Sequence, residues 1–294
     1  MKLLNTGYLK LTADQIEELK AKGHELVLME SEKDEVPCPP EEIEGMIANV
    51  FFWYHDIEPF TNLKFIQLLS AGYDRVPMDY ITKHGIEIHN AEDVYSIPIA
   101  EHVIGSVLQL YRQSRFFEQN QKNHGWAKRY DLLELNGKRV VILGCGNIGR
   151  ACAKRFKAFE CEVIGLNRSK KDYENFDAIL PLSSLKDEAA KADVLVVAIP
   201  ITEETRGIID ADVLGAMKET AVLVNIARGT IVDEEALIKA MPNLGGAVLD
   251  VFNEEPLDKE NPLWDMENVI ITPHNSFVGD GNDERMWKVI LGNL

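Results

Sequence analysis

Short apolar runs alternate with helix-like stretches in the first part of the chain. A strand is predicted over residues 2–8, and apolar positions three and four apart predict a helix over about 13–22. Thr12 suits the cap of that helix while Gln15 reaches back, and Gly23 supplies the left-handed residue that ends it. Further strands are predicted over residues 24–29, 47–53, 64–69 and 86–89. Strands that alternate with helices predict a parallel sheet.

The middle of the chain has a different pattern. A helix with one apolar face is predicted from Pro98, a good first-turn residue, toward Arg115, and we interpret it as an interdomain helix. The polar stretch 112–128 follows, with aromatic residues such as Phe117 and Trp126 embedded in it. Two interpretations fit this stretch: a solvated loop, or an arm that contacts another subunit.

After this stretch the alternation restarts, and six strands are predicted over residues 139–143, 162–166, 194–199, 221–226, 246–251 and 269–272. Since βαβ crossovers are right-handed, strands and helices in this order predict a doubly wound sheet that binds ligands beyond the carboxyl ends of its strands. The 294 residues suffice for two domains. We therefore predict an α/β protein with two doubly wound parallel-sheet domains. Residues 1–96, joined by 275–294, form a flavodoxin-like substrate domain, and residues 97–274 form a Rossmann dinucleotide-binding domain.

Composition narrows the class of protein. The chain has 46% hydrophobic and 27% charged residues, as a folded globular protein does. A formal net charge of −17, without a visible basic patch, argues against nucleic-acid binding. We expect no secretory leader and no membrane span, because no apolar run approaches ~18 residues, and hence a cytoplasmic location. No metal site is predicted, and free thiols are expected at four cysteines without CxxC spacing: Cys38, Cys145, Cys152 and Cys161.

A glycine-rich turn stands between the strand at 139–143 and a helical pattern. Gly144 permits the tight turn, Gly146 lets a diphosphate approach the backbone, and Gly149 allows the helix to pack closely on the strand. The helix N-terminus offers its unpaired amides to the anion. A bare GxGxxG pattern is also compatible with an ordinary turn, but its place between strand and helix predicts dinucleotide binding by Gly144, Gly146, Asn147, Ile148 and Gly149.

The end of the next strand predicts which dinucleotide binds. An acidic residue that accepts hydrogen bonds from the adenosine ribose is usual about 20 residues on, and this chain has Asn167 there. Arg168, Ser169, Lys170 and Lys171 follow. Although the lysines are compatible with ordinary solvated charges, the Arg168 guanidinium can hold a phosphate with two hydrogen bonds. NADP is therefore predicted as the favoured cofactor, with NAD as the alternative.

Three polar residues follow apolar strands in the second half of the chain: Arg228, Glu255 and His274. Singly, each is compatible with a surface charge or a structural histidine. Together they match the needs of 2-keto acid reduction: an anchor for carboxylate and carbonyl, a proton donor, and a group that tunes the donor. We expect His274 to exchange the proton with the substrate oxygen, Glu255 to favour the imidazolium, and Arg228 to orient the substrate.

The same segments carry a resemblance to a known family. Over nearly its whole length the chain resembles the D-isomer-specific 2-hydroxyacid dehydrogenases. The resemblance implies that Arg228, Glu255 and His274 are the catalytic residues and that the enzyme is a homodimer. The motifs that carry it are Gly144 to Gly149, Asn225-Ile226-Ala227-Arg228-Gly229 with Val232-Asp233, Leu249-Asp250-Val251-Phe252 with Glu254-Glu255-Pro256-Leu257, and Thr272-Pro273-His274.

The resemblance implies further binding residues. The cofactor would be contacted by Pro200, Thr202, Thr205 and Ala227, and its nicotinamide carboxamide by Asp250. The substrate would be bound by Ser70, Ala71 and Gly72, whose small side chains let backbone amides approach a carboxylate, together with Arg228 and His274. Glu101 and His102 match the start of the family's interdomain helix and are interpreted as structural.

The predicted activity is hydride transfer between NADP(H) or NAD(H) and a small 2-keto or D-2-hydroxy acid. Glyoxylate and hydroxypyruvate are the favoured substrates. Trp53 and its neighbours Tyr54, His55 and Asp56 offer aromatic surface with little positive charge, which argues against a phosphorylated substrate. Two alternatives remain: a phosphoglycerate dehydrogenase, and a dinucleotide-sensing, corepressor-like binding protein on the same scaffold.

Overall fold

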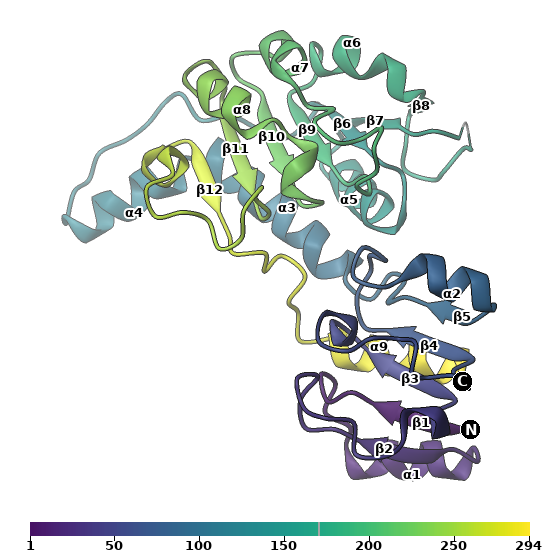
Figure 1. Cartoon of the computed structure of the whole chain (residues 1–294). Helices are drawn as coiled ribbons and strands as arrows, with labels where there is room; N and C mark the ends of the chain where they lie inside the picture. The colour runs from purple at the N-terminus through teal and green to yellow at the C-terminus, as the bar shows by residue number, and fades with distance from the viewer. Residues whose placement is uncertain (170) are drawn as a thin grey trace. The chain divides into compact units, whose positions relative to one another are not determined.

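The computed structural model describes residues 1–169 and 171–294, which form two compact units (Figure 1). The first unit comprises Met1–Tyr95 and Asp280–Leu294, and the second comprises Ser96–Gly279. Each contains one parallel sheet with helices, so the predicted α/β fold class is confirmed. The sites of each unit can therefore be described from its own sheet.

The sheet of the first unit has five parallel strands in the order β2-β1-β3-β4-β5. This is the predicted flavodoxin-like order. Its strands are short, and Leu3 of β1 pairs with Leu26 and Gly45 of the neighbouring strands. The strand bounds are β1 Lys2–Asn5, β2 Glu25–Leu28, β3 Gly45–Ala48, β4 Phe65–Leu68 and β5 Glu87–His89.

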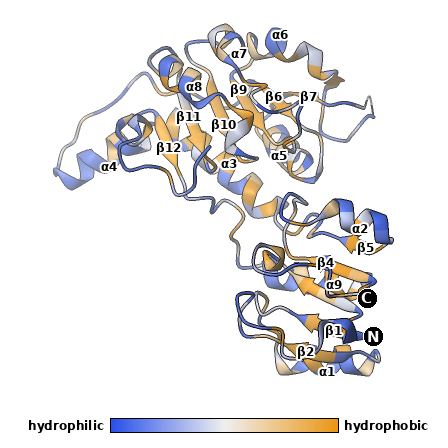
Figure 2. Cartoon of the chain, in the orientation of Figure 1, coloured by the Kyte–Doolittle hydropathy of each residue, from blue (hydrophilic) through white to orange (hydrophobic). Residues whose placement is uncertain are grey.

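Alternating side chains of this sheet build a core on each face. On one face, Leu3 and Ile47 pack with residues of α1 (Ala13–Ala21) and of the C-terminal helix α9 (Asn282–Asn293). On the other face, Leu4 and Met46 pack with α2 (Met78–His84) and the segment 51–63. Figure 2 shows the apolar residues concentrated in the strands, whereas the helices carry both apolar and polar residues. The predicted capping box at Thr12 and Gln15 is confirmed.

The predicted strand 47–53 is wrong in its second half. Strand β3 ends at Ala48, and Phe51–Trp53 form a 3₁₀ turn (η2). The cause is Glu32, whose buried carboxylate accepts hydrogen bonds from the Asn49 amide at 2.7 Å and the Val50 amide at 2.8 Å. These amides are withdrawn from strand pairing, so the chain turns and buries Phe51 in the core. A second 3₁₀ turn, η1, spans Pro40–Glu42.

The sheet of the second unit has seven parallel strands, one more than predicted, in the order β12-β11-β10-β9-β6-β7-β8. The missed strand is β8, Ala178–Leu180, which is short, half-buried and paired only with β7. An edge strand of three residues carries too little apolar periodicity to be recognised. The other bounds are β6 Arg139–Leu143, β7 Glu162–Leu166, β9 Val194–Val197, β10 Val222–Asn225, β11 Gly246–Leu249 and β12 Val269–Ile271.

Helices cover both faces of this sheet. On one face α3 (Ser96–Tyr111) packs on α5 (Asn147–Ala158) and on β11. On the other, a large core joins the strands to α6 (Leu185–Ala189), α7 (Ala211–Ala216) and α8 (Glu234–Ala240). Short 3₁₀ turns lie in the connections: η3 Leu182–Ser184, η4 Gly229–Ile231, η5 Met241–Asn243 and η6 Pro262–Asp265.

The polar stretch after α3 contains a helix that was not predicted. The chain leaves the helical path at Gln113, whose φ of 52° is left-handed, and α4 follows over Ser114–Lys122. The helix predicted from Pro98 toward Arg115 therefore ends earlier than predicted, at Tyr111. Beyond α4, Trp126 is 94% exposed and Tyr130 is 89% exposed.

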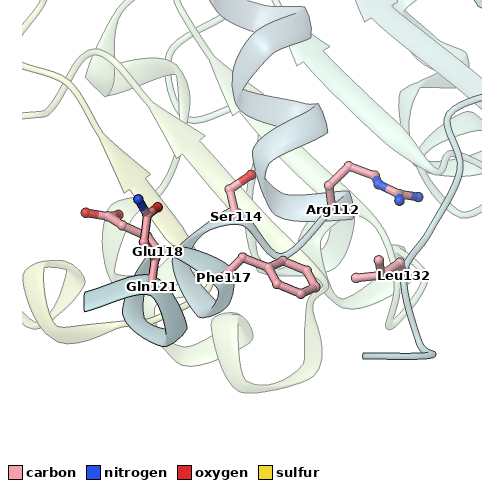
Figure 3. Close-up of a pocket in the computed structure, with 6 residues that line it drawn as sticks. All are labelled: Arg112, Ser114, Phe117, Glu118, Gln121 and Leu132. Carbon is pink, nitrogen blue, oxygen red and sulfur yellow. The ribbon is translucent and has the colours of Figure 1, made fainter. Parts of the chain in front are cut away.

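A cavity of about 500 Å³ lies between the end of α3 and α4 (Figure 3). None of the predicted catalytic residues lines it; the lining residues are Arg112, Ser114, Phe117, Glu118, Gln121 and Leu132. Among the described residues, no helix combines the length and apolar character needed to cross a membrane. The four cysteines are free thiols, as predicted.

Candidate active site

The glycine turn lies between β6 and α5, where the sequence placed it. Gly144 has a φ of +105°, and its amide donates to Leu166 O at 2.9 Å, which fixes the turn against β7. A Cβ on Gly149 would lie 1.9 Å from Gly144 O, so α5 can approach the turn only with glycine there. Two of the three glycines are therefore required by the backbone itself.

The third glycine leaves room for a ligand. A Cβ on Gly146 would meet no atom within 4 Å, and Gly146 is exposed at the N-cap of α5 without a side-chain capping bond. Amides in the first turn of a helix lack intrahelical acceptors, and the helix dipole favours an anion there. The turn therefore fits a dinucleotide diphosphate, which would be held by the amides of Gly146, Asn147 and Ile148.

The end of β7 presents polar and basic groups to solvent. The half-buried Asn167 donates from Nδ2 to Ser169 Oγ at 3.1 Å and to Ser169 O at 3.3 Å. Arg168 and Ser169 are exposed, and the predicted contribution of Lys170 falls on a residue outside the described ranges. Asn167 thus shapes the turn, and the Arg168 side chain is accessible to a ligand.

Hydrogen bonds from its own hydroxyl groups hold the loop after β9 in shape. Thr205, which is buried, donates from Oγ1 to Pro200 O at 2.8 Å and accepts from the Thr202 amide at 2.7 Å. Thr202 Oγ1 in turn accepts from the Thr205 amide at 3.3 Å. Thr205 therefore holds the loop shape, while Pro200 is exposed and Thr202 half-buried at its surface.

Glu255 and His274 form a direct pair. His274 Nδ1 lies 2.8 Å from Glu255 Oε2, and Glu255 Oε1 accepts from the Phe252 amide at 3.1 Å. The His274 side chain is 30% exposed and the Glu255 side chain 38% exposed, so both remain accessible. Burial by itself raises the pKa of the Glu255 carboxyl, but the hydrogen bonds from His274 and the Phe252 amide and the charges of His274 and Arg228 outweigh it, and the net pKa lies below its usual value.

The loop that carries Arg228 lies against the loop that leads to Glu255. A Cβ on Gly229 would lie 1.9 Å from the Phe252 carbonyl carbon, so the loop after β10 touches the loop after β11 at a point where only glycine fits. Asn225 holds the first loop by donating from Nδ2 to Arg228 O at 3.0 Å, and Arg228 donates from Nη1 to Ala227 O at 2.7 Å. The structure thus gathers a guanidinium, a carboxylate and an imidazole at adjacent strand ends.

Asp250 has a larger structural role than its predicted contact with a carboxamide. It is 1% exposed, and its carboxylate accepts from the Asn275 amide at 2.8 Å, the Ser276 amide at 3.1 Å, Ser276 Oγ at 2.5 Å and Thr272 Oγ1 at 2.5 Å. Its carbonyl accepts from the His274 amide at 2.8 Å. His274 has a left-handed φ of 51°, so Asp250 stabilises an unfavourable backbone conformation at the residue predicted to transfer the proton.

The predicted substrate loop lies in the first unit, after β4. Its carbonyls are all held: Ser70 O accepts from the Ala91 amide at 2.9 Å, Ala71 O from Asn90 Nδ2 at 2.7 Å, and Gly72 O from Ser70 Oγ at 3.0 Å. In a trans peptide the N–H points opposite to the C=O, so these bonds turn the amides of Ala71, Gly72 and Tyr73 the other way. Each amide thus points away from the donor that holds the preceding carbonyl, which leaves it open to the predicted substrate carboxylate.

Sequence reasoning missed the cations beside the aromatic residues of this unit. The Arg75 guanidinium lies 5.2 Å from the Trp53 ring centroid, and Lys33 Nζ lies 5.5 Å from that of Tyr54. The expectation of little positive charge is corrected here, because folding brings residues from other loops to the rings. The cavity of about 260 Å³ beside Trp53 is also lined by three carboxylates, Asp56, Glu58 and Asp74.

The two residues interpreted as structural lie on α3. Glu101 forms an ion pair with Arg155 of α5 at 3.1 Å. Burial lowers the pKa of His102, and the nearby Asp250 carboxylate acts in the opposite direction. The ion pair joins α3 to α5 within the second unit, and both observations agree with a supporting role.

Comparison with known proteins identifies the family. The model of the catalytic domain of the D-isomer specific 2-hydroxyacid dehydrogenases matches residues 8–160, and that of their NAD binding domain matches residues 104–276. Glyoxylate/hydroxypyruvate reductase A of Arabidopsis thaliana is 37% identical over 81% of this chain and 76% of its own. Glyoxylate reductase of Pyrococcus horikoshii is 34% identical over 81% of this chain and 75% of its own.

A solved structure extends the similarity to the whole chain. The NADPH-dependent glyoxylate/hydroxypyruvate reductase of Sinorhizobium meliloti, in complex with citrate, superposes with a TM-score of 0.80. It is 27% identical, and the superposition covers 99% of this chain and 92% of that one. Together with the family models and the strand orders of both sheets, these likenesses show that the chain belongs to the D-isomer specific 2-hydroxyacid dehydrogenase family and is an NAD(P)-dependent oxidoreductase.

Proposed function

We propose that this enzyme reduces a small 2-keto acid of the glyoxylate or hydroxypyruvate type to its D-2-hydroxy acid with NADPH. The observation that carries the proposal is the His274–Glu255 pair at 2.8 Å, with the charge of Arg228 acting on the same carboxylate. These groups would supply proton transfer and anion binding at the edge of the parallel sheet where the glycine turn of the same unit also lies.

The Glu255–His274 pair supports assigning the transferred proton to one nitrogen of His274. Because the lowered pKa of Glu255 keeps that carboxyl ionised near neutral pH, the His274 Nδ1–H stays hydrogen-bonded to it. Nε2 is then the nitrogen that donates a proton to the carbonyl oxygen in reduction and accepts one from the alcohol in oxidation. Arg228 orients the substrate carboxylate and stabilises the developing negative charge. When bound, the nicotinamide dinucleotide supplies the hydride.

The preference for NADP is proposed from the end of β7. The uncharged Asn167 replaces the carboxylate that would repel a 2′-phosphate, and the exposed Arg168 follows it. In addition, the Sinorhizobium meliloti relative is described as NADPH-dependent. Among the remaining proposed cofactor contacts are Pro200 and Thr202 at the surface of the β9 loop.

The class of substrate is proposed from the charges of the first unit and from the relatives. The amides around Ala71 and Gly72 would bind the substrate carboxylate. The neighbouring cavity has more carboxylates than cations on its walls, which disfavours a second negative charge such as a phosphate. Two curated relatives are named for glyoxylate, one of them also for hydroxypyruvate.

We further propose a homodimer in a reducing compartment such as the cytoplasm. Trp126 and Tyr130 are almost fully exposed beyond α4, close in sequence to the cavity of Figure 3, as an isologous contact through this arm would require.

The cysteines support the proposed reducing compartment. Cys145, Cys152 and Cys161 are buried free thiols, and burial raises the pKa of each.

The test is a steady-state assay of NADPH and NADH oxidation with glyoxylate, hydroxypyruvate, pyruvate and 3-phosphohydroxypyruvate. We expect the highest kcat/KM for glyoxylate or hydroxypyruvate with NADPH. Higher kcat/KM with the phosphorylated acid would identify a phosphoglycerate dehydrogenase. Tight dinucleotide binding without turnover of any acid would indicate a cofactor-sensing binding protein instead.

A further inference from the structure

A cluster of cations lies beside the β7 end and includes residues that were not predicted to bind anything. The Arg150 guanidinium lies 5.3 Å from the centroid of the Tyr173 ring, and Lys171 Nζ lies 5.5 Å from the same centroid. Arg150 comes from α5, directly after the glycine turn, whereas Tyr173 and Lys171 come from the loop between β7 and β8. Cations from two elements therefore lie beside one aromatic ring. One element follows the glycine turn directly, and the other follows β7, the strand that the turn contacts through Gly144.

Arg150 is held in place from two sides. Its Nη2 donates to Asn147 Oδ1 at 2.5 Å, one turn earlier on α5, while the half-buried Tyr173 ring supports the guanidinium face. The hydrogen bond uses one of the five N–H donors of a guanidinium. Arg150 itself is exposed. Its planar fork is thus oriented in advance, with donors that a bound oxyanion can accept.

The local charge contrasts with that of the whole chain. The formal net charge is −17, yet Arg150 and Lys171 lie beside one ring, and the exposed Arg168 stands three residues before Lys171 in the same loop. Asp172 and Glu174 flank Tyr173 and offset part of that charge. A cation–π contact at an exposed site is weak, so it gives little reason by itself to bring like charges together. A bound phosphate would remove the repulsion between them.

We propose that Arg150, oriented by Tyr173 and Asn147, is a second specificity-determining residue for the 2′-phosphate of NADP, acting with Arg168. The inference rests on the proposed NADP preference and deepens it. Lys171, whose Nζ lies 5.5 Å from the centroid of the same ring, adds attraction. In this arrangement the phosphate is recognised by cations from both α5 and the β7–β8 loop, and Tyr173 is the positioning residue that joins them.

The experiment measures binding of ligands that lack nicotinamide, by isothermal titration calorimetry on the full chain. Adenosine 2′,5′-bisphosphate carries the 2′-phosphate, and AMP lacks it. The variants are Arg150→Gln, Arg168→Gln, Tyr173→Leu and Tyr173→Phe. Lys154→Gln is the matched control, because it removes one exposed positive charge from the next turn of α5. Thermal unfolding of each variant establishes that it is folded.

We expect Arg150→Gln to weaken the bisphosphate by at least about tenfold and AMP by less than about twofold, since a hydrogen bond to a charged group is lost. Tyr173→Leu should give a smaller selective loss, which Tyr173→Phe restores because the ring remains. Lys154→Gln should reduce bisphosphate binding by less than about twofold through long-range charge alone.

Two failures are distinguishable. If the unmodified enzyme binds the bisphosphate more tightly than AMP, and Arg150→Gln changes both ligands equally or neither, the role of Arg150 is overturned while the NADP preference stands. If the unmodified enzyme binds both ligands equally, the proposed NADP preference itself is overturned, and the role of Arg150 with it.

Discussion

The turn around His274 and the loop around Arg168 illustrate two ways of building a functional segment. The His274 turn is fixed by a buried carboxylate, Asp250, that accepts hydrogen bonds from three residues of the turn. The Arg168 loop is exposed, and its described contacts are a polar turn at Asn167 and the ring of Tyr173. Proton transfer needs atoms at a set position, whereas attraction of a phosphate tolerates movement. Changes in the first region should therefore alter turnover and stability, and changes in the second mainly cofactor affinity.

The largest effect is expected from His274→Ala. Removing the proposed proton donor should lower kcat by roughly 10²–10⁴-fold, while the dissociation constant of NADPH changes by less than about twofold. Stopped-flow single-turnover assays and fluorescence titration with NADPH measure the two quantities. A variant with near-normal kcat would show that another group transfers the proton.

Asp250→Asn tests whether the buried carboxylate fixes the His274 turn. An amide NH₂ would face the donors of Asn275 and Ser276, leaving buried polar groups without acceptors, and should lower the free energy of unfolding by about 1–3 kcal/mol. The left-handed conformation of His274 would also lose support, so kcat should fall. Urea unfolding and steady-state kinetics check both. Asp265→Asn, at an exposed position of the same unit, is the control, and an equal loss in it would refute the assignment.

Much of the fold and of this site could be predicted from the sequence because its signals are local. The glycine turn has strand, turn and helix within a few residues, and Arg228, Glu255 and His274 each follow an apolar strand. Parallel strands end at one edge of a sheet, so residues far apart in sequence meet there. The cap at Thr12 was predictable for the same reason, since its partner is three residues away.

The features that escaped prediction depend on tertiary contacts. Glu32 ends β3 from another loop, β8 is a short edge strand, and Arg75 reaches Trp53 only after folding. Likewise the bonds that make Asp250 a positioning residue come from a segment more than 20 residues later. A sequence pattern gives periodicity and strand ends, but it does not specify which side chain lies over which ring.

Arg168→Gln tests the exposed region. The loss of a charge-assisted contact should weaken NADPH by about tenfold and NADH by less than about twofold, with kcat at saturating NADPH nearly unchanged. Raising the salt concentration should narrow the difference between the unmodified enzyme and the variant, because exposed charges are screened. An equal loss for both dinucleotides would mean that Arg168 acts on a part that they share. A fall in kcat at saturating NADPH would show that the exposed region also affects turnover, contrary to the difference proposed between the two regions.

The smallest effect is expected for the free energy of unfolding of Glu255→Gln, measured as a function of pH. The pKa of Glu255 lies below its usual value near 4.5, so the folded state holds this proton less tightly than the unfolded state. Its stabilisation is complete above that usual value and is lost as the pH falls through the lowered one. The side chain is 38% exposed, so solvent screens the interaction and the difference should be small. Urea unfolding at pH 7, 5, 4 and 3.5 should show the unmodified enzyme slightly more stable at the two higher values, with the gap closing below about pH 4.5. A gap that widens in acid would mean that Glu255 is not ionised in the folded enzyme, and the assignment of the transferable proton to His274 Nε2 would lose its basis.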